Sequence, residues 1–474
     1  MKDKISAWVD AHESDILTHT QAILRVPSVK ETAEAEDGAP FGRAVADALV
    51  QTLALCDDLG MKTENFDGYA GHAEFGDGEE IVGMLGHLDV VPTGEGWTKD
   101  PWGAEISEGY IWGRGTSDDK GPTFAALFGA KAVMDLCAAE GITLSRKIRL
   151  IFGCDEESGW DCMKHYFGPA GQVKPTVAFT PDAYFPLVYA EKGSFTAVVT
   201  RSVPESSSAL IRVAWLDSGL RPNMVPRDAS ALLVGVPEGL EMVEPVLAAM
   251  PGITVETTAE GLLVRALGKS AHGSTPQQGD NAAVKLMRAL TSQISVFDDL
   301  ASSDFEWMSD LAGRGAPDGS AVGIAGSDDI TGALTINLGV VSCRDGLISA
   351  TFNVRYPATW DGDDTTGRLK RSVAETGWEV AKLSHTPPLY VPQDQEPVKT
   401  LLRVYREQTG DYTTPPMTIG GRTYATSVAP VGVAYGASMP GDEDCAHQAD
   451  ERLLVERLLQ CAKIYGHALY ELAK

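Results

Sequence analysis

The chain has 474 residues, of which 39 are basic and 66 acidic, and therefore a formal net charge of −27. With 43% hydrophobic and 22% charged residues it has the composition of a folded globular protein, and its length exceeds what one hydrophobic core commonly supports, so we expect at least two domains. The negative charge excludes a general binder of nucleic acid or of anionic membranes, because both ligands require a basic surface.

The cysteines and the N-terminal sequence indicate the compartment. Seven cysteines without a C-x-x-C pair, and a polar N-terminus without an apolar segment, predict a reduced cytoplasmic protein without a signal peptide. The sequence has no long uninterrupted apolar run, so it predicts no segment that spans a membrane. Cys154 and Cys445 lie close in sequence to candidate site residues, and we interpret them as packing residues.

The first part of the chain predicts an α/β domain, from the spacing of its apolar residues. The predicted elements are a helical region over 1–45, a strand that begins in the apolar run 80–91 and ends near Gly86 and His87, strands over 147–154 and 176–180, and a helix from Lys120 to about Glu140. Strands that alternate with helices in this way indicate a mainly parallel sheet with helices on both faces.

After about residue 190 the pattern changes to alternating strands with two helices between them, which predicts an inserted α+β domain. The predicted strands cover 194–203, 208–216, 229–236, 253–268 and 347–357, and the helices cover 241–250 and 281–295. Amphipathic helices follow again near the C-terminus. We therefore expect one domain built from residues 1–189 and 385–474, interrupted by a second domain at 190–384.

Histidine and acidic residues stand at the carboxyl ends of the predicted strands of the first domain. His87 ends the first strand, Glu156 and Glu157 follow the second, and Asp182 follows the third. Asp118, just before the predicted long helix, lies beside the same edge. In an open α/β sheet this edge binds ligands. One histidine and several carboxylates, with a second histidine from elsewhere, suit two divalent ions such as Zn²⁺ or Mn²⁺.

Each of these residues has a simpler interpretation when it is taken alone. His87 and Asp89 can be a core histidine and a solvated acid, or a metal ligand whose second ring nitrogen is held by the carboxylate. Asp118 and Asp119 can cap the helix that follows, and for Asp119 we favour a cap or a supporting role behind the ligands. The three acids 155–157 can form a solvated turn, and the acid after the third strand can be an ordinary turn residue.

The combination of motifs resembles the M20 family of metallopeptidases, and most closely its PepV-like dipeptidases. The motifs that carry the resemblance occur in the family's order over nearly the whole chain: GHLDVVP, GRGTSDDKGP, DEESGW, TPDA, SAHGSTP, NVRYP and DEDCAHQADE. The resemblance implies a hydrolase that cleaves the peptide bond of unblocked dipeptides by a metal-bridged hydroxide. It also implies that the inserted domain is a lid of the catalytic domain.

The resemblance implies a ligand set for two ions. His87 and Asp182 would hold one ion, Glu157 and His447 would hold the other, and Asp118 would bridge the two. Zn²⁺ is the first expectation for these ligands, and Mn²⁺ or Co²⁺ are alternatives.

The resemblance also implies the residues that act on the substrate. Glu156 would be the general base and acid, and Asp89 would support the His87 imidazole. From the lid, His272 would polarise the scissile carbonyl, while Asn223 and Arg355 would bind the substrate. Arg355 is expected to hold the terminal carboxylate by a bidentate pair.

The glycine stretch before the last ligand departs from the family pattern. PepV-like proteins carry Gly-Gly-Gly-Thr-Tyr-Ala-Arg there, whereas this chain has Gly420, Gly421 and Arg422, and Thr426 in place of the final arginine. A glycine loop lets backbone N–H groups approach a substrate, so we expect these three residues to contact it. Arg422 either adds a contact for an anion or narrows the pocket, and this makes substrate preference the property most affected.

Three other functions fit parts of the pattern. A deacylase or N-acyl amino acid amidohydrolase of the same family would apply the same chemistry to another amide, although Asp rather than Glu at position 182 favours aminopeptidase-type substrates by resemblance. A non-catalytic metal- or peptide-binding protein and a structural or interaction protein are the other two. The resemblance further implies a monomer with a dipeptide as its partner, because the large insertion supplies His272 within the same chain.

Overall fold

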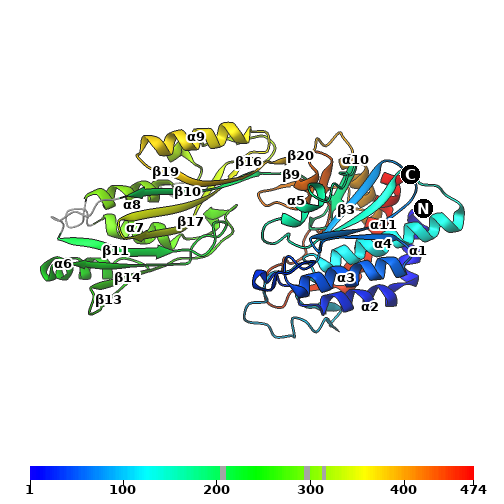
Figure 1. Cartoon of the computed structure of the whole chain (residues 1–474), viewed down its shortest axis with the longest axis horizontal. Helices are drawn as coiled ribbons and strands as arrows, with labels where there is room; N and C mark the ends of the chain where they lie inside the picture. The colour runs from blue at the N-terminus through cyan, green and yellow to red at the C-terminus, as the bar shows by residue number, and fades with distance from the viewer. Residues whose placement is uncertain (203–209, 293–298, 312–316) are drawn as a thin grey trace. The chain divides into compact units, whose positions relative to one another are not determined.

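The computed structural model describes residues 1–202, 210–292, 299–311 and 317–474 (Figure 1). Residues 203, 208–209 and 293–295 of the predicted elements lie outside the described residues. The chain divides into two compact units. The first unit comprises Met1–Ala190, Leu389–Thr418 and Arg422–Lys474, and the second comprises Glu191–Pro388 and Ile419–Gly421.

A nine-stranded sheet forms the centre of the first unit. Its strands are β1 (Lys62–Phe66), β2 (Ala70–Phe75), β3 (Ile81–His87), β6 (Lys147–Gly153), β7 (Val177–Thr180), β9 (Val188–Glu191), β20 (Leu389–Tyr390), β21 (Met417–Ile419) and β22 (Gly432–Ala434). The order is β1-β2-β6-β3-β7-β22-β9-β20, with β21 paired to β9. Strands β6, β3, β7 and β22 are parallel, while β1–β2, β2–β6 and β22–β9 are antiparallel. Every residue of β3 is buried, which explains its dense apolar sequence.

Two smaller sheets and nine helical segments complete the described part of the first unit. The smaller strands are β4 (Glu105–Ser107), β5 (Tyr110–Trp112) and β24 (Arg452–Leu454) in one sheet, and β8 (Ala183–Tyr184) with β23 (Ala437–Ser438) in the other. The helical segments are α1 (Lys2–Ala11), α2 (Glu13–Leu24), η1 (Thr32–Glu34), α3 (Arg43–Asp58), α4 (Lys120–Glu140), α5 (Asp161–Phe167), α10 (Val398–Thr409), η4 (Tyr424–Val428) and α11 (Val455–Ala473). The predicted helical region over 1–45 is interrupted after Leu24, because Pro27 and Pro40 do not fit a helix interior.

Helices cover both faces of this sheet. A side chain at Gly71 in β2 would meet Leu49 and Leu53 of α3, whereas the next residue, His72, contacts Tyr166 of α5 through a 2.7 Å hydrogen bond. Successive strand residues point to opposite faces, so α3 and α5 lie on opposite sides of β2. The predicted α/β class with helices on both faces is confirmed.

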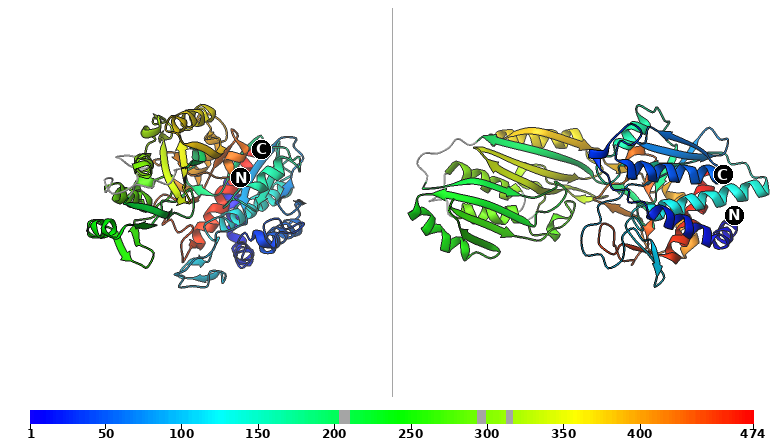
Figure 2. Two further views of the ribbon diagram at one scale, coloured as in Figure 1. Left: turned by 60° about the vertical axis from the view of Figure 1, so that its left-hand side comes forward. Right: turned by 60° about the horizontal axis from the view of Figure 1, so that its bottom comes forward.

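Helices α4 and α11 lie side by side and pack closely (Figures 1 and 2). Their backbones approach at Gly129 and Gly466, where a Cβ on Gly129 would lie 2.6 Å from the Gly466 nitrogen. Helix α4 is long and apolar enough to cross a membrane by length and composition, but 67% of its most apolar window is buried inside the structure. Its apolar sequence is therefore explained by packing in the core.

An eight-stranded antiparallel sheet forms the second unit. Its strands are β10 (Gly193–Ser202), β11 (Ile211–Ser218), β12 (Asp228–Gly235), β13 (Ile253–Thr257), β14 (Leu262–Leu267), β17 (Thr335–Arg344), β18 (Leu347–Tyr356) and β19 (Glu379–Thr386), in the order β13-β14-β12-β11-β17-β18-β10-β19. The other elements are α6 (Pro237–Ala248), η2 (Pro276–Gln278), α7 (Ala282–Thr291), α8 (Asp299–Leu311), η3 (Ser320–Val322), β15 (Ser327–Asp328), β16 (Gly332–Ala333) and α9 (Gly362–Glu375). This arrangement confirms the predicted α+β class of the insertion.

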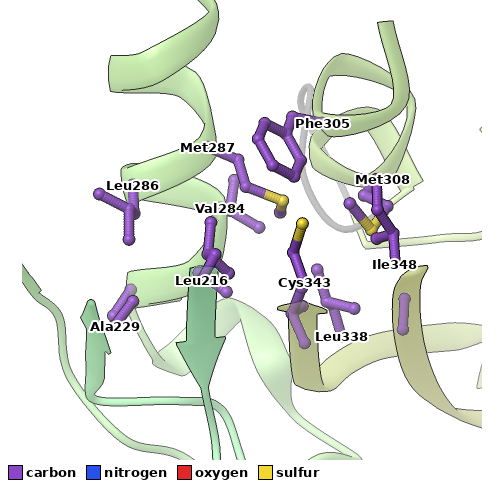
Figure 3. Close-up of a cluster of buried hydrophobic side chains, with 14 of the residues drawn as sticks. Leu216, Ala229, Val284, Leu286, Met287, Phe305, Met308, Leu338, Cys343 and Ile348 are labelled. Carbon is purple, nitrogen blue, oxygen red and sulfur yellow. The ribbon is translucent and has the colours of Figure 1, made fainter. Parts of the chain in front are cut away.

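The core of the second unit lies between this sheet and its helices. Met287 of α7 and Phe305 of α8 point toward Cys343 and Leu338 of β17 (Figure 3). All four side chains are buried, and from Val340 to Arg344 buried positions of β17 alternate with more exposed ones. One buried face of the sheet is enough to set the register of its strands, because a shift by one residue would expose the apolar set.

We expect Gly129→Ala to destabilise the protein, although alanine favours a helix over glycine by about 1 kcal/mol. The added methyl group would press on the backbone of α11, and overpacking of this kind costs about 1–3 kcal/mol. Urea unfolding of the variant measures this difference. Gly367→Ala in α9 is the matched control, because only the end of the Arg371 side chain, 3.5 Å away, faces the new methyl group. A gain in stability is expected for G367A, and a gain for G129A would contradict the packing argument.

Candidate functional site

The carboxyl ends of three neighbouring parallel strands bring the predicted ligands of the first unit together. His87 is the last residue of β3, Glu156 and Glu157 follow β6, and Asp182 follows β7. Strand β3 lies between β6 and β7, so these ends meet at one edge of the sheet. Asp118 immediately precedes the N-cap residue of α4 and lies at the same edge.

Asp118 lies between two imidazole rings. Its Oδ1 is 3.0 Å from Nε2 of His87, and its Oδ2 is 3.0 Å from Nε2 of His447. The same nitrogen of His447 is 2.9 Å from Oε1 of Glu157. His447 comes from a segment far along the chain, and this fold returns it to the strand edge. Each carboxylate oxygen of Asp118 therefore faces a different histidine.

Two groups of donor atoms at this edge are close enough to hold a cation. One group is His87, Asp118 and Glu157, the other is His87, Glu156 and Asp182, and the donor atoms within each group lie within 4.8 Å of one another. Carboxylate oxygens and imidazole nitrogens at this spacing suit Zn²⁺, Mn²⁺ or Co²⁺. Both groups use His87, and one of them includes Glu156, so the donor atoms present fit the binding of a divalent cation at this edge.

The acidic surroundings favour the protonated, positively charged form of both histidines. Burial by itself lowers the pKa of the His87 imidazole, but hydrogen bonds to Asp118 and Asp89 outweigh it and hold the pKa well above its usual value. Burial also lowers the pKa of the half-exposed His447, but the hydrogen bonds and charges of Asp118 and Glu157 together raise it to about 11. Burial opposes the ionised form of Asp118 as well, yet its contacts with both rings hold its pKa well below the usual range.

The pKa values of the remaining acids at this edge are raised, in contrast to the lowered pKa of Asp118. Burial raises the pKa of Asp182 and of Glu156 well above the usual carboxyl value, and the neighbouring carboxylates raise both further. The pKa of Glu157 is raised mainly by burial and by Asp118, in spite of its hydrogen bond to His447. Acids that hold protons for lack of positive charge are the acids that a divalent cation would ionise.

Asp89 and Asp155 shape the turn that carries Glu156 and Glu157. The Asp89 carboxylate accepts the N–H groups of Glu156 at 3.0 Å and of Glu157 at 3.1 Å. Asp155 accepts Lys30 Nζ at 2.6 Å and the N–H of Asp161 at 3.0 Å, so the first of the three consecutive acids is structural. The other two carboxylates remain for chemistry.

His87 is oriented by the backbone rather than by the carboxylate that the sequence suggested. Its Nδ1 lies 2.8 Å from the carbonyl oxygen of Asp89, and 3.6 Å from the Asp89 carboxylate. Since a carbonyl only accepts, Nδ1 carries a proton, and Nε2 faces Asp118. Asp119, for which a supporting role is predicted, accepts the His87 N–H at 3.2 Å and the Thr123 hydroxyl at 2.8 Å.

Arg422 and two aromatic residues border Glu156, and the two aromatics had no predicted role. The Arg422 guanidinium lies over the Trp160 ring, 4.8 Å from its centroid, and the Trp160 indole N–H donates to the Glu156 carbonyl at 2.8 Å. Tyr424 contacts the rings of both Trp160 and His87 edge to face. Trp160 and Tyr424 belong to the motifs DEESGW and GGRTYA. Their position beside the acidic and glycine residues of these motifs was the sequence signal that could have identified them.

The predicted lid residues come together within the second unit. The N–H of Gly273 donates to the Asn223 carbonyl at 2.7 Å, which pairs the Asn223 backbone with the segment of His272. Arg355 donates to the Gly420 carbonyl at 3.3 Å and to the Asn353 side chain at 3.0 Å.

Ser274 sets the protonation of the His272 ring, a role that the sequence did not indicate. Its N–H lies 3.3 Å and its hydroxyl 2.6 Å from Nδ1 of His272. Because a backbone N–H only donates, Nδ1 is the acceptor, and in the neutral ring Nε2 carries the proton. The ring therefore offers a hydrogen-bond donor at Nε2. Gly421, next to Gly420, has open space on its Cβ side apart from the Ile419 side chain at 3.7 Å.

Sequence comparisons identify a family and relatives that are similar to this chain. The profile of peptidase family M20/M25/M40 matches residues 83–471. A Bacillus subtilis (strain 168) protein named "Putative dipeptidase YtjP" is 37% identical over 474 residues and covers 98% of each chain. A Staphylococcus aureus (strain bovine RF122 / ET3-1) protein named "Putative dipeptidase SAB1611c" is 32% identical over 473 residues, again with 98% of each chain.

Solved structures share the fold at low sequence identity. An M20 family metallo-carboxypeptidase from Sulfolobus solfataricus matches with a TM-score of 0.58 at 16% identity, over 96% of this chain and 99% of that chain. The di-peptidase Dug1p from Saccharomyces cerevisiae matches with a TM-score of 0.55 at 14% identity, over 99% and 98%. At these identities the likeness concerns the fold alone.

Divalent cations are expected to stabilise the protein, because they would relieve the repulsion among the half-buried acids of the edge. At 100 times the dissociation constant the gain is about 2.7 kcal/mol. Thermal unfolding after chelation, and again with added Zn²⁺ or Mn²⁺, measures it. Asp182→Asn removes one half-buried acid, so the chelated variant should melt above chelated wild type and respond less to the ions. KCl at equal ionic strength is the control, and an equal rise with KCl would argue against a specific site.

Proposed function

We propose that this chain, which belongs to peptidase family M20/M25/M40 and is a hydrolase of peptide bonds, acts on dipeptides with a free amino group. The observation that carries the proposal is Asp118 placed between the imidazoles of His87 and His447, with Glu156 at the same edge. Two relatives that match the chain over 98% of their length have names that include the word dipeptidase, which supports this substrate class.

In this proposal two divalent ions bind at the strand edge. His87, Asp118, Glu157, Asp182 and His447 would hold these ions. When bound, such ions polarise a scissile carbonyl and lower the pKa of a water molecule. Zn²⁺ is our first choice, and Mn²⁺ or Co²⁺ are alternatives with the same donor preference.

Glu156 moves the proton. Its carboxylate takes a proton from the attacking water and delivers it to the nitrogen of the leaving amine. The hydrogen bonds from its own N–H to Asp89 and from Trp160 to its carbonyl hold its backbone on both sides. The side chain can therefore change its protonation state without movement of the turn.

Residues of the second unit bind and polarise the substrate in this proposal. His272 donates from Nε2 to the oxyanion that develops on the scissile carbonyl, since its Nδ1 is already occupied by Ser274. Asn223 and Arg355 bind the substrate backbone and its terminal carboxylate. Gly420 and Gly421 of the same unit, and Arg422 of the first unit, also contact the substrate in this proposal, and the Arg422 charge favours substrates with an additional acidic group.

We further propose that the protein is a monomer in the cytoplasm. The inserted unit supplies His272 from the same chain, so one chain carries all the proposed residues. All seven cysteines lie in the described part of the chain, and each is free and buried, which suits a reducing compartment.

Glu156→Gln should lower the turnover of an unblocked dipeptide by about 100- to 10,000-fold, because an amide cannot accept the proton. Metal content should stay at the wild-type value, since Glu156 is not among the proposed ligands. A coupled assay for released amino acid and metal analysis of the same sample measure both quantities. Asp161→Asn, at an exposed acid five residues later, is the matched control and should keep full turnover.

The same assay separates the alternatives. Hydrolysis of N-acetylated amino acids but not of free-amino dipeptides would assign the chain to the deacylases instead. Metal binding without turnover of either substrate would favour a binding protein. Near wild-type hydrolysis by E156Q would remove Glu156 from the role of general base.

His272→Ala should lower kcat for the dipeptide by about 100- to 1,000-fold, the effect of losing one oxyanion donor. KM and metal content should change little. The matched control is His385→Ala in the same unit, where the ring bonds the Tyr356 hydroxyl at 2.6 Å and has no proposed contact with substrate. If H272A and H385A lose turnover equally, the loss reflects the stability of the unit and not an oxyanion contact.

A further inference from the structure

Glu451 is fully buried and collects hydrogen bonds from a loop 333 to 337 residues earlier in the chain. The N–H groups of Gly115, Ser117 and Asp118 donate to its Oε1 at 3.1, 2.9 and 3.2 Å. The Ser117 hydroxyl donates to the same oxygen at 3.0 Å. Four donors from one loop thus converge on a single carboxylate oxygen.

The second oxygen of Glu451 is held as firmly. The Arg114 guanidinium donates to Oε2 at 2.5 Å, and the side chains of the pair are 1% and 0% exposed. In addition, the N–H of Gly113 donates to the Glu451 carbonyl at 2.9 Å. Neighbouring backbone N–H groups that point to one centre form a concave site for an anion. Here the anion is the Glu451 carboxylate of the same chain, and the loop 113–118 surrounds it.

These contacts connect two of the proposed ligands. Asp118 lies at the end of the loop that Glu451 holds, and its own N–H is one of the donors. His447 lies four residues before Glu451 in the same segment. The distance of 3.0 Å between Asp118 and His447 therefore depends on a carboxylate that fastens both segments to each other.

We propose that Glu451 is a positioning residue of the metal centre, which fixes the separation of Asp118 and His447 and contacts neither ion nor substrate. The inference rests on the proposed function and deepens it, because it names the residue that keeps the bridging ligand and a terminal ligand in register. Loss of a residue that orients metal ligands typically weakens metal binding or activity by about 10- to 100-fold.

Calorimetric titration of the chelated full-length chain with Mn²⁺ tests this inference. Glu451→Gln keeps the shape of the side chain, but its NH₂ group must face either Arg114 or the loop N–H groups, and both are donors. One set of donors then has no acceptor, so we expect at least one Mn²⁺ to bind about 10- to 100-fold more weakly. Excess Mn²⁺ should restore much of the lost dipeptide turnover, with KM nearly unchanged.

Glu74→Gln is the matched control, because it also breaks a buried pair of the first unit. Glu74 lies 2.7 Å from Arg149, their side chains are 8% and 9% exposed, and the pair sits toward the opposite end of β6 from Glu156. Both variants should melt at lower temperature than wild type. Only E451Q should lose Mn²⁺ affinity, which a purely structural role of Glu451 would not produce.

Ser117→Ala covers the case in which E451Q does not fold, since it removes one hydroxyl donor and leaves the charge pair intact. A folded S117A with weaker Mn²⁺ binding supports the inference. Wild-type Mn²⁺ affinity in E451Q, or in S117A when E451Q is unfolded, overturns it. A wild-type chain that binds Mn²⁺ but cleaves no dipeptide refutes the proposed function and leaves the affinity comparison intact, so the two failures are distinguishable.

Discussion

The half-buried acids at the carboxyl ends of β6 and β7 lie close enough to repel one another when they are ionised, and the site is built around that repulsion. Two imidazoles on either side of Asp118 supply part of the positive charge, while Glu156 and Asp182 lie near His87 in a second donor group. Desolvated carboxylates at this spacing are unfavourable without cations. The same feature that lowers stability therefore provides the donor atoms that the proposed divalent ions require.

Close packing behind the edge determines where Asp118 stands. A side chain on Gly86 of β3 would collide with Thr123 in the first turn of α4, so the strand and the helix meet without space between them. Asp119 then bonds both Thr123 and the N–H of His87, which ties the loop before α4 to the end of β3. Together with Glu451 on its other side, this packing leaves Asp118 little freedom to move away from the two histidines.

The departure at Arg422 has a structural explanation that its sequence position alone did not supply. A guanidinium stacked on Trp160 has lost part of its freedom, and a cation above an aromatic face is attracted by the ring. Because Trp160 also bonds the Glu156 carbonyl, the arginine and the proposed general base belong to one packed group. The positions of Arg422 and Glu156 are therefore linked through Trp160 in this chain.

The sequence by itself determined the fold class, the candidate ligands and some of the elements, because strand burial, helix spacing and long ordered motifs are local properties of the chain. It predicted β3 and α4 nearly to the residue, yet it missed the polar strand β1 and extended the first helical region past Pro27. Only the tertiary structure decided that the Asp89 carbonyl, not its carboxylate, holds His87, and that Glu451 fastens the loop of Asp118. Such contacts form only when folding brings distant residues together. The spacing of residues along the chain does not specify which oxygen of a side chain or of the backbone will face a distant donor.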